Sequence, residues 1–183
     1  LWLIGFGEQT TFLDRMQFLK GLPDEKFVNG IDAFMYLHGK PRLLLTELGA
    51  DHPETIAGTT ATLMDAVERG GEWIGKPTAG SFGRDVFRVS RDDPNARVII
   101  EHLTAEGFAV LQRRVDTSQE KRVLVANGTI VGVYGKSPSD HRGNVAAGSE
   151  ATVAQLDDRE TALVRRAIAT LAALGVRFAT LDI

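Results

Sequence analysis

A glycine-rich loop near the middle of the chain is the segment best suited to contact phosphate. Residues 75–89 read GKPTAGSFGRDVFRV, so Lys76 directly precedes a loop of small residues and an alternating apolar run follows. Glycine lets backbone N–H groups approach a polyphosphate closely, and a lysine on the incoming strand can neutralise its charge. A P-loop or a dinucleotide fingerprint would continue into a helix, whereas this loop continues into a strand. The residues alone leave two interpretations open, a phosphate-covering hairpin and a mobile surface turn.

Three further polar groups could take part in chemistry. Lys121 and Arg122 begin the strand-like run KRVLVA, Arg142 and Asn144 lie in the loop SDHRGNVAAGS, and Asp182 lies near the end of an apolar strand. Arginine suits bidentate recognition of phosphate or carboxylate, and an aspartate can hold Mg²⁺ together with substrate phosphates. Each group also has a plain structural interpretation, as solvated strand-end charge or ordinary surface loop. The histidines show no metal-ligand spacing, so none is assigned to a metal.

Helices must position these groups, and capping signals mark where they begin and end. The apolar spacing predicts helices over residues 11–20 and over residues 59–69, the second with Leu63, Ala66 and Val67 on one side and two glycines after it. Asp32 is expected to cap a short helix, and a further helix is expected to run from Pro94 to Gly107. A capping box predicts the final helix from Asp157 and Glu160, with one face made of Leu163, Ala167, Leu171 and Leu174.

Strands and hairpins account for most of the remaining sequence. Strand-like runs flank the glycine-rich loop and predict a hairpin, and Asn127-Gly128 between alternating apolar runs predicts a second one. Other strands are expected at residues 1–6, 26–30, 108–115 and 176–183. A strand at each end suggests a piece cut from a longer chain. Because strands and helices do not alternate regularly, the fold class is predicted to be α+β.

Composition excludes several classes of protein. The net charge is −3, 43% of the residues are hydrophobic and 25% are charged, which fits a folded globular chain without a basic surface for nucleic acid or an anionic membrane. No apolar run approaches the roughly 20 residues that a membrane helix needs. The chain has no cysteine, so disulfides and thiolate metal sites are excluded, and we expect a cytoplasmic location.

The order of these segments resembles the ATP-grasp module of bacterial glutathione synthetases. KPTAGSFGRDVFRV, DDPNARVIIEHLTAEG, LQRRV, EKRVLVANGTIVGV, HRGNVAAGS and TLDI follow one another as in that family, from about Pro53 to the end of the chain. The resemblance implies two α+β lobes that hold ATP between them, preceded by the tail of an N-terminal domain. It places that tail and a linker at residues 1–50 and the ATP-grasp domain at residues 51–183, divided into lobes at residues 51–111 and 112–183.

The resemblance also implies a reaction and its cofactors. A substrate carboxylate takes the γ-phosphate of ATP in the presence of Mg²⁺, and an amine attacks the acyl phosphate to form an amide. In glutathione synthetases the acid is γ-glutamylcysteine and the amine is glycine. Small-molecule substrates are therefore expected, without nucleic acid or membrane partners, and homo-oligomers are common in the family. The fragment as given is expected to be inactive, since further magnesium ligands would follow Ile183.

Individual residues take their roles from matching positions in the family. The resemblance assigns Lys40, Lys76 and the loop residues to the phosphates, residues 112–115 to the adenine, Arg122 and the RGN segment to the transferring phosphoryl group, and Asp182 to Mg²⁺. The cofactor-binding candidates are Lys40, Lys76, Gly80, Ser81, Gly83, Gln112, Arg113, Arg114 and Val115; the catalytic candidates are Arg142, Asn144 and Arg122; the metal ligand is Asp182.

The chain departs from the family at several positions. Ala79 and Phe82 stand where the family loop carries an acidic residue and paired glycines, Lys136 replaces an arginine, and Ser149 replaces a glycine. An N-terminal segment, GEQTTFLD, differs from the family's acidic substrate motif. These departures leave two alternatives open: an ATP-grasp ligase that adds an amino acid to another peptide or protein, and a degenerate domain that binds nucleotide without chemistry.

Overall fold

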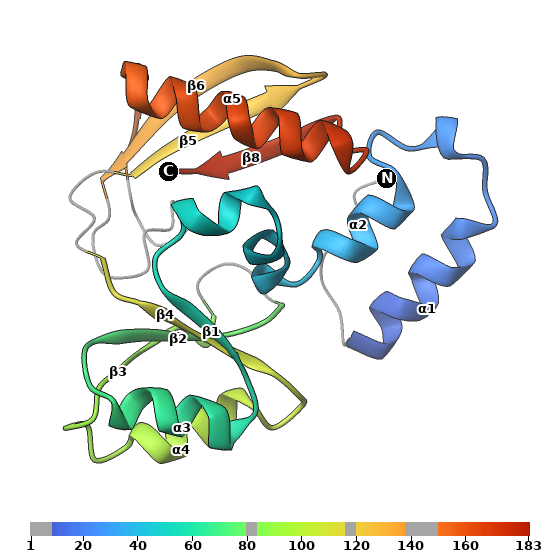
Figure 1. Ribbon diagram of the computed structural model, residues 1–183. Helices are drawn as coiled ribbons and strands as arrows, with labels where there is room; N and C mark the ends of the chain where they lie inside the picture. Colours follow the sequence, from blue (N-terminus) through green and yellow to red (C-terminus); the bar gives the residue numbers. More distant parts are fainter. Residues whose placement is uncertain (1–8, 80–83, 116–119, 138–149) are drawn as a thin grey trace. The chain divides into compact units, whose positions relative to one another are not determined.

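The computed structural model of the protein describes residues 9–79, 84–115, 120–137 and 150–183 (Figure 1). These residues form two compact units. The terminal unit is drawn from Leu1–His38, Glu120–Gly135 and Ala151–Ile183, and the middle unit from Gly39–Gln119 and Lys136–Glu150. Two four-stranded sheets with flanking helices confirm the predicted α+β class. Among the described residues, no helix has the length and apolar character that a membrane span requires.

The middle unit is built on a fully antiparallel sheet with two helices on one face (Figure 1). Its strand order is β1-β4-β2-β3, with β1 at Thr55–Gly58, β4 at Ala109–Arg113, β2 at Trp73–Pro77 and β3 at Phe87–Val89. The helices are α3, Thr60–Glu68, and α4, Ala96–Leu103; the short 3-10 helices η2, Lys40–Leu45, and η3, Glu47–Asp51, precede β1. Between sheet and helices lies a core of Leu63, Val67, Trp73, Ile100 and Leu111, none more than 1% exposed.

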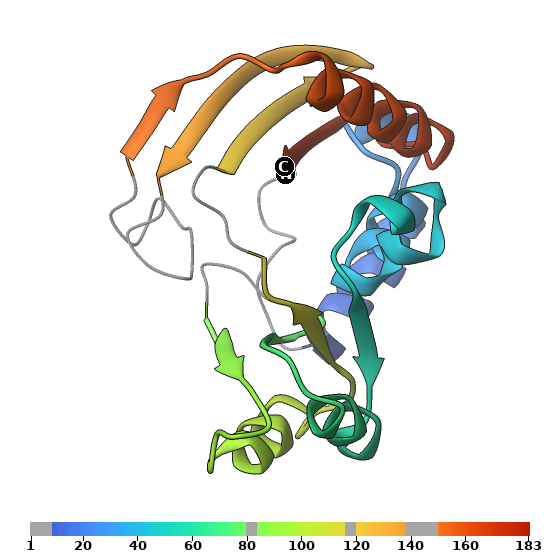
Figure 2. The ribbon, with the colours of Figure 1, turned by 60° about the vertical axis from the view of Figure 1, so that its left-hand side comes forward.

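The terminal unit contains the other sheet, with α5, Asp158–Ala173, along one face (Figure 2). The strand order is β7-β6-β5-β8, with β7 at Glu150–Val153, β6 at Thr129–Ser137, β5 at Glu120–Ala126 and β8 at Phe178–Asp182. Val123, Val125 and Val164 form the core between this sheet and α5. A separate cluster of Phe12, Met16 and Ile31 joins α1, Gln9–Lys20, to α2, Ile31–Leu37, with η1, Asp24–Lys26, between them.

Local signals in the sequence located most of these elements correctly. The capping box of Asp157 and Glu160 is present at the start of α5. Asn127 and Gly128 have φ values of 46° and 76°, the left-handed pair that a type I′ hairpin requires. The two strands that flank the glycine-rich loop, β2 and β3, pair antiparallel as expected.

Other predictions were wrong where a distant partner or a local turn decides the structure. Residues 26–30 form no strand; Asn29 there bonds the backbone of Phe178 through its side chain. Asp32 is not a cap, because α2 begins after Gly30 and Asp32 pairs with Lys20.

The helix predicted from Pro94 begins at Ala96, since the Asp93 carboxylate accepts the Asn95 N–H and closes a turn. In α5 the fully buried residue is Val164 rather than Leu163, and neither β1 nor β7 was expected from the sequence.

Candidate functional site

Lys76 lies on the face of the middle sheet that the helices leave uncovered. Direct cross-strand partners share a face, and Lys76 stands opposite Val110, while Gln112 stands opposite both Ile74 and Thr55. The alternate residues of the same strands point into the helix-covered core. The sheet therefore presents lysine, glutamine and threonine side chains together on one surface.

A chain of hydrogen bonds holds Lys76 in place. The lysine Nζ donates to Gln112 Oε1 at 2.8 Å, Gln112 Nε2 donates to Thr55 Oγ1 at 3.1 Å, and Thr55 Oγ1 donates to the Pro53 carbonyl at 2.7 Å. Each donor has one acceptor, so the chain fixes which way the Gln112 amide points. Burial lowers the pKa of Lys76. The ammonium keeps donors beyond the one that Gln112 receives, which suits it to an anionic ligand.

His52 belongs to the same neighbourhood. Burial lowers the pKa of His52, and the charge of Lys76 lowers it further. Both shifts favour the neutral imidazole beside the charged lysine, and perturbed groups gathered in this way are a feature of many binding sites. No local pattern pointed to this arrangement, because 24 residues separate His52 and Lys76 along the chain.

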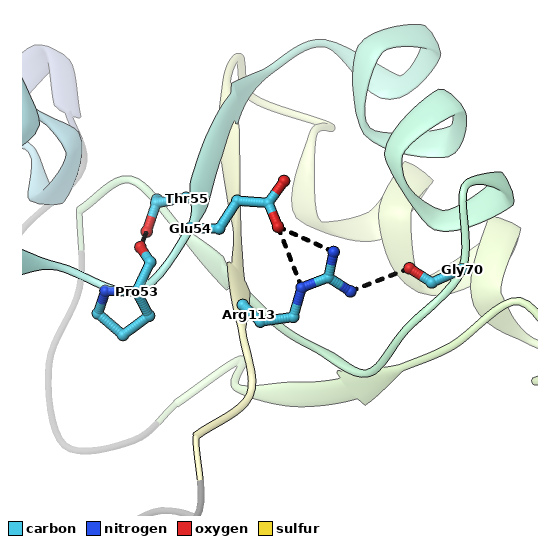
Figure 3. A network of polar contacts seen from close by, with 5 residues as sticks. All are labelled: Pro53, Glu54, Thr55, Gly70 and Arg113. Atoms are coloured by element: carbon cyan, nitrogen blue, oxygen red, sulfur yellow. Dashed lines mark hydrogen bonds and ion pairs between the residues drawn. The ribbon is translucent and has the colours of Figure 1, made fainter. Parts of the chain in front are cut away.

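Arg113, the last residue of β4, points to the opposite side of the sheet from Gln112. Its guanidinium donates from Nε and Nη2 to Glu54 Oε2 at 3.1 and 2.8 Å and from Nη1 to the Gly70 carbonyl at 3.0 Å (Figure 3). The same group lies 3.9 Å from the centre of the Trp73 ring. The side chain of Arg113 is thus used within the protein. The contact of its backbone with adenine, which the family resemblance implies, stays a prediction.

Arg114 and Val115 continue from the end of β4. Arg114 Nη1 donates to Glu72 Oε2 at 2.6 Å, and its backbone N–H donates to the Glu72 carbonyl at 2.9 Å. This pairing lowers the pKa of Glu72. Val115 is half-exposed. Glu54, Thr55 and Glu72, the partners of residues 112–114, went unrecognised because nothing in their local sequence distinguishes them from other strand-edge residues.

Arg122 and Asp182 form a second polar group in the terminal unit. They stand directly opposite each other on β5 and β8 and are joined by bonds of 2.6 Å from Nε to Oδ1 and 2.7 Å from Nη2 to Oδ2. The bond to Asp182 raises the pKa of Arg122, and Tyr134 acts in the same direction. Next to them, Lys121 Nζ binds both carboxylate oxygens of Glu160 at 2.7 and 2.6 Å, so Lys121 supports α5.

The remaining predicted site residues stay predictions. Gly80, Ser81, Gly83, Arg142 and Asn144 lie outside the described residues. Lys40 begins η2, but its side chain is not among those described. The described part of the chain holds no cluster of three or more His, Cys, Asp or Glu side chains that suits a metal. Asp182 is the magnesium ligand that was predicted, and its role stays a prediction.

Comparison with known proteins identifies the wider group to which these features belong. Residues 42–183 match the family model described as prokaryotic glutathione synthetase, ATP-grasp domain. A glutathione synthetase of Photorhabdus laumondii is 35% identical over 139 residues, which cover 72% of this chain and 44% of that protein. The chain thus spans less than half the length of this curated relative.

Solved structures agree on the fold. The D-cycloserine synthetase DcsG is similar with a TM-score of 0.70 at 21% identity, over 95% of this chain and 65% of that one. D-alanine–D-alanine ligase from Bacillus anthracis, in complex with ATP, is similar with a TM-score of 0.60 at 14% identity, over 84% of this chain and 52% of that one. At these identities the likeness shows a shared ATP-grasp fold.

Proposed function

The chain belongs to the prokaryotic glutathione synthetase ATP-grasp family. We propose that the protein is an ATP-dependent carboxylate–amine ligase that makes glutathione. The substrates are γ-glutamylcysteine, glycine and ATP, and the products are glutathione, ADP and phosphate. The observation that carries the proposal is the family match over residues 42–183, which includes both sheets. Curated glutathione synthetases at 35% identity support the same substrates.

The middle unit supports a role in holding nucleotide phosphates. Lys76 is partly buried and oriented by Gln112, so a polyphosphate meets a charge whose position is already fixed. Catalysis of phosphoryl transfer depends mainly on such positioning and on neutralising charge. Lys40 and the loop residues Gly80, Ser81 and Gly83 would extend this surface, and the backbone of Arg113, Arg114 and Val115 would meet the adenine.

Arg122 of the terminal unit would stabilise the transferring phosphoryl group, and the family resemblance gives Arg142 and Asn144 the same task. Asp182 fits a magnesium site only in part, since Arg122 binds both of its carboxylate oxygens. Magnesium, when bound, neutralises charge on the ATP phosphates. The homo-oligomer and the cytoplasmic location stay predictions of the family resemblance.

The test uses the complete protein and measures ADP release and amide formation together. We expect ATP-dependent formation of glutathione from γ-glutamylcysteine and glycine, identified by mass spectrometry. Lys76→Ala should weaken MgATP binding by about hundredfold, the scale of removing a charge-assisted contact. Lys20→Ala is the matched control, because Lys20 is an exposed lysine of α1 that pairs with Asp32 of α2.

Two outcomes would overturn the proposal. Release of ADP with D-alanine or a peptide acceptor, but not with γ-glutamylcysteine and glycine, would show a different ligase. MgATP binding without amide formation from any acid and amine would show a nucleotide-binding domain without ligase chemistry. If Lys76→Ala formed ADP at the rate of the unsubstituted protein, Lys76 would not be part of the ATP site, and the ligase assignment would still stand.

A further inference from the structure

The Arg113 side chain closes a network that gathers three separate segments of the middle unit. Glu54 lies just before β1 and Gly70 follows α3, and both accept hydrogen bonds from the guanidinium of Arg113 (Figure 3). Trp73 begins β2, and the same guanidinium lies over its ring. The Arg113 backbone N–H also donates to the Glu54 carbonyl at 2.7 Å. Main chain and side chain together therefore fasten the end of β4 to the start of β1.

Two glycines make this network possible. Gly70 and Gly71 have φ values of +88° and +90°, a conformation that turns the chain out of α3 and that other residues rarely adopt. A Cβ at position 71 would lie 1.7 Å from Nη1 of Arg113. Gly71 thus leaves the space that the guanidinium occupies, and any side chain there would displace it.

Trp73 supplies the apolar surface of the network. Trp73 is 1% exposed, and the guanidinium lies 3.9 Å from the centroid of its ring, a distance that gives a cation–π attraction. Its Nε1 is buried and has no hydrogen-bond partner among the described residues. The indole is therefore placed by packing under Arg113 rather than by a polar bond of its own.

The contacts of the Arg113 side chain lie on the opposite face of the sheet from the hydrogen bonds that hold Lys76. Gln112 and Arg113 are consecutive on β4, so their side chains leave the strand on opposite faces. Both are anchored to residues 53–55, Gln112 through Thr55 and Arg113 through Glu54. A shift of the end of β4 would therefore move Gln112 and, through it, Lys76.

We propose that Arg113 is a positioning residue for nucleotide binding: its contacts with Glu54, Gly70 and Trp73 fix the end of β4, so that Gln112 holds Lys76 and the backbone of residues 113–115 meets the adenine. This proposal rests on the proposed function. It assigns to the Arg113 side chain a role on the face of the sheet away from Lys76, where it contacts no nucleotide. Stability alone is a weaker explanation, because Arg113 and Glu54 are 35% and 55% exposed, and ion pairs at that exposure contribute little.

The experiment compares Arg113→Met and Arg113→Lys in the complete protein. Methionine keeps an apolar side chain over Trp73 but has no guanidinium to bind Glu54 and Gly70. Lysine keeps the positive charge but lacks the planar guanidinium that donates from several nitrogens at once. We expect Arg113→Met to raise the KM for ATP by about tenfold, with the KM of the acid and the amine unchanged, because a displaced Lys76 would lose part of its charge-assisted contact with the phosphates. Arg113→Lys should recover part of that change.

A second readout needs no nucleotide. Hydrogen exchange in the free protein should quicken at residues 109–115 in Arg113→Met and stay unchanged in α3 and α4, because the side-chain contacts that hold the end of β4 are lost. Arg97→Ala is the matched control: it removes an exposed arginine that pairs with Glu101 in α4. This variant should change neither the KM for ATP nor the exchange at residues 109–115.

The outcomes separate this proposal from the function on which it rests. An Arg113→Met variant with a lowered melting temperature and a parental KM for ATP would overturn the positioning role and leave the ligase assignment standing. An equal rise in the KM of all substrates would also overturn it, since it would indicate general loosening. Failure of the unchanged protein to bind ATP would overturn both.

Discussion

Arg122 and Asp182 bind each other across two neighbouring strands, through bonds of 2.6 and 2.7 Å that occupy both carboxylate oxygens. They lie opposite each other in the register of β5 and β8, so strand pairing itself brings them together. The family resemblance gives them different tasks, contact with the phosphoryl group and binding of Mg²⁺. In this structure each therefore depends on the other for its orientation.

Arg122→Ala should reduce activity far more than stability. The side chains are 32% and 47% exposed, so the pair is expected to contribute less than about 1 kcal/mol to the free energy of unfolding. Loss of a fixed positive charge at a transferring phosphoryl group is expected to lower kcat/KM by about hundredfold. Urea denaturation and ADP release measure the two effects separately.

Arg165→Ala, which removes an exposed arginine of α5, serves as the control for that comparison and should change neither quantity. The kcat/KM of Arg122→Lys should lie between those of the unsubstituted protein and the alanine variant. Lysine keeps the positive charge but lacks the guanidinium that binds both oxygens of Asp182. Activity that falls only in proportion to the amount of folded protein would assign Arg122 a purely structural role.

The buried lysine of the middle unit predicts an unusual dependence of stability on pH. Burial lowers the pKa of Lys76 below 10.5, so the unfolded chain holds this proton more tightly than the folded protein. Stability then rises with pH between the lowered pKa and 10.5. Lys76→Met has no proton to lose, so the stability of the parent relative to this variant should increase as the pH rises through that window.

Urea unfolding midpoints of the two proteins, measured over a series of alkaline pH values, test this difference. Lys20→Met is the control of opposite sign: the hydrogen bond to Asp32 raises the pKa of Lys20, so its contribution is lost rather than gained at high pH. Parallel pH curves for the parent and Lys76→Met would contradict a buried, destabilising charge at position 76.

Local chemistry in the sequence was enough to locate most of the elements that carry the candidate site, although not β1. The Asp157–Glu160 capping box and the Asn127-Gly128 turn act through neighbours two to four residues away, and both were confirmed. The strand predicted over residues 108–115 is β4, Ala109–Arg113. The alternation of a strand places Gln112 and Arg113 on opposite faces, but it does not identify the partners of either side chain.

What the sequence could not predict depends on partners far along the chain. Strand β1 is only four residues long and was missed, because its register with β4 joins residues more than 50 positions apart. Thr55 and Glu54 acquire their roles only through that register. Asn29 was expected in a strand and turn, yet its partner is 149 positions away, and no local pattern encodes such a contact.

His52 should make the protein less stable in mild acid. Burial and the charge of Lys76 hold the pKa of His52 below 6.5, so the unfolded chain binds this proton more readily than the folded one. The stability that neutral His52 provides is therefore lost as the pH falls from 6.5 through the lowered pKa. His52→Asn should flatten the dependence of the unfolding free energy over that window.

The charge of Lys76 can be separated from burial by following the His52 pKa directly by NMR. In Lys76→Met we expect that pKa to rise but to stay below 6.5, because burial is the larger cause. An unchanged His52 pKa in Lys76→Met would show that the lysine charge does not reach the imidazole.

Asn29 should stabilise β8, the strand that carries Asp182. Its Oδ1 accepts hydrogen bonds from the N–H groups of Arg177 and Phe178, and its Nδ2 donates to the Phe178 carbonyl, each at 2.8 Å. A single side chain thus takes the place of a neighbouring strand at the start of β8. Asn29→Ala removes all three bonds and is expected to cost about 2 kcal/mol of unfolding free energy, since each contributes roughly 0.5 to 1.5 kcal/mol.

Asn29→Asp distinguishes the acceptor from the donor, because it keeps both bonds to Oδ1 and loses only the one from Nδ2. Its stability should lie between those of the parent and the alanine variant. Asn95→Ala is the control, because Asn95 precedes α4 without a side-chain capping bond. Urea denaturation with hydrogen exchange at residues 178–182 provides the measurement. Equal unfolding free energies for Asn29→Ala and Asn95→Ala would mean that β8 is held by its pairing with β5 alone.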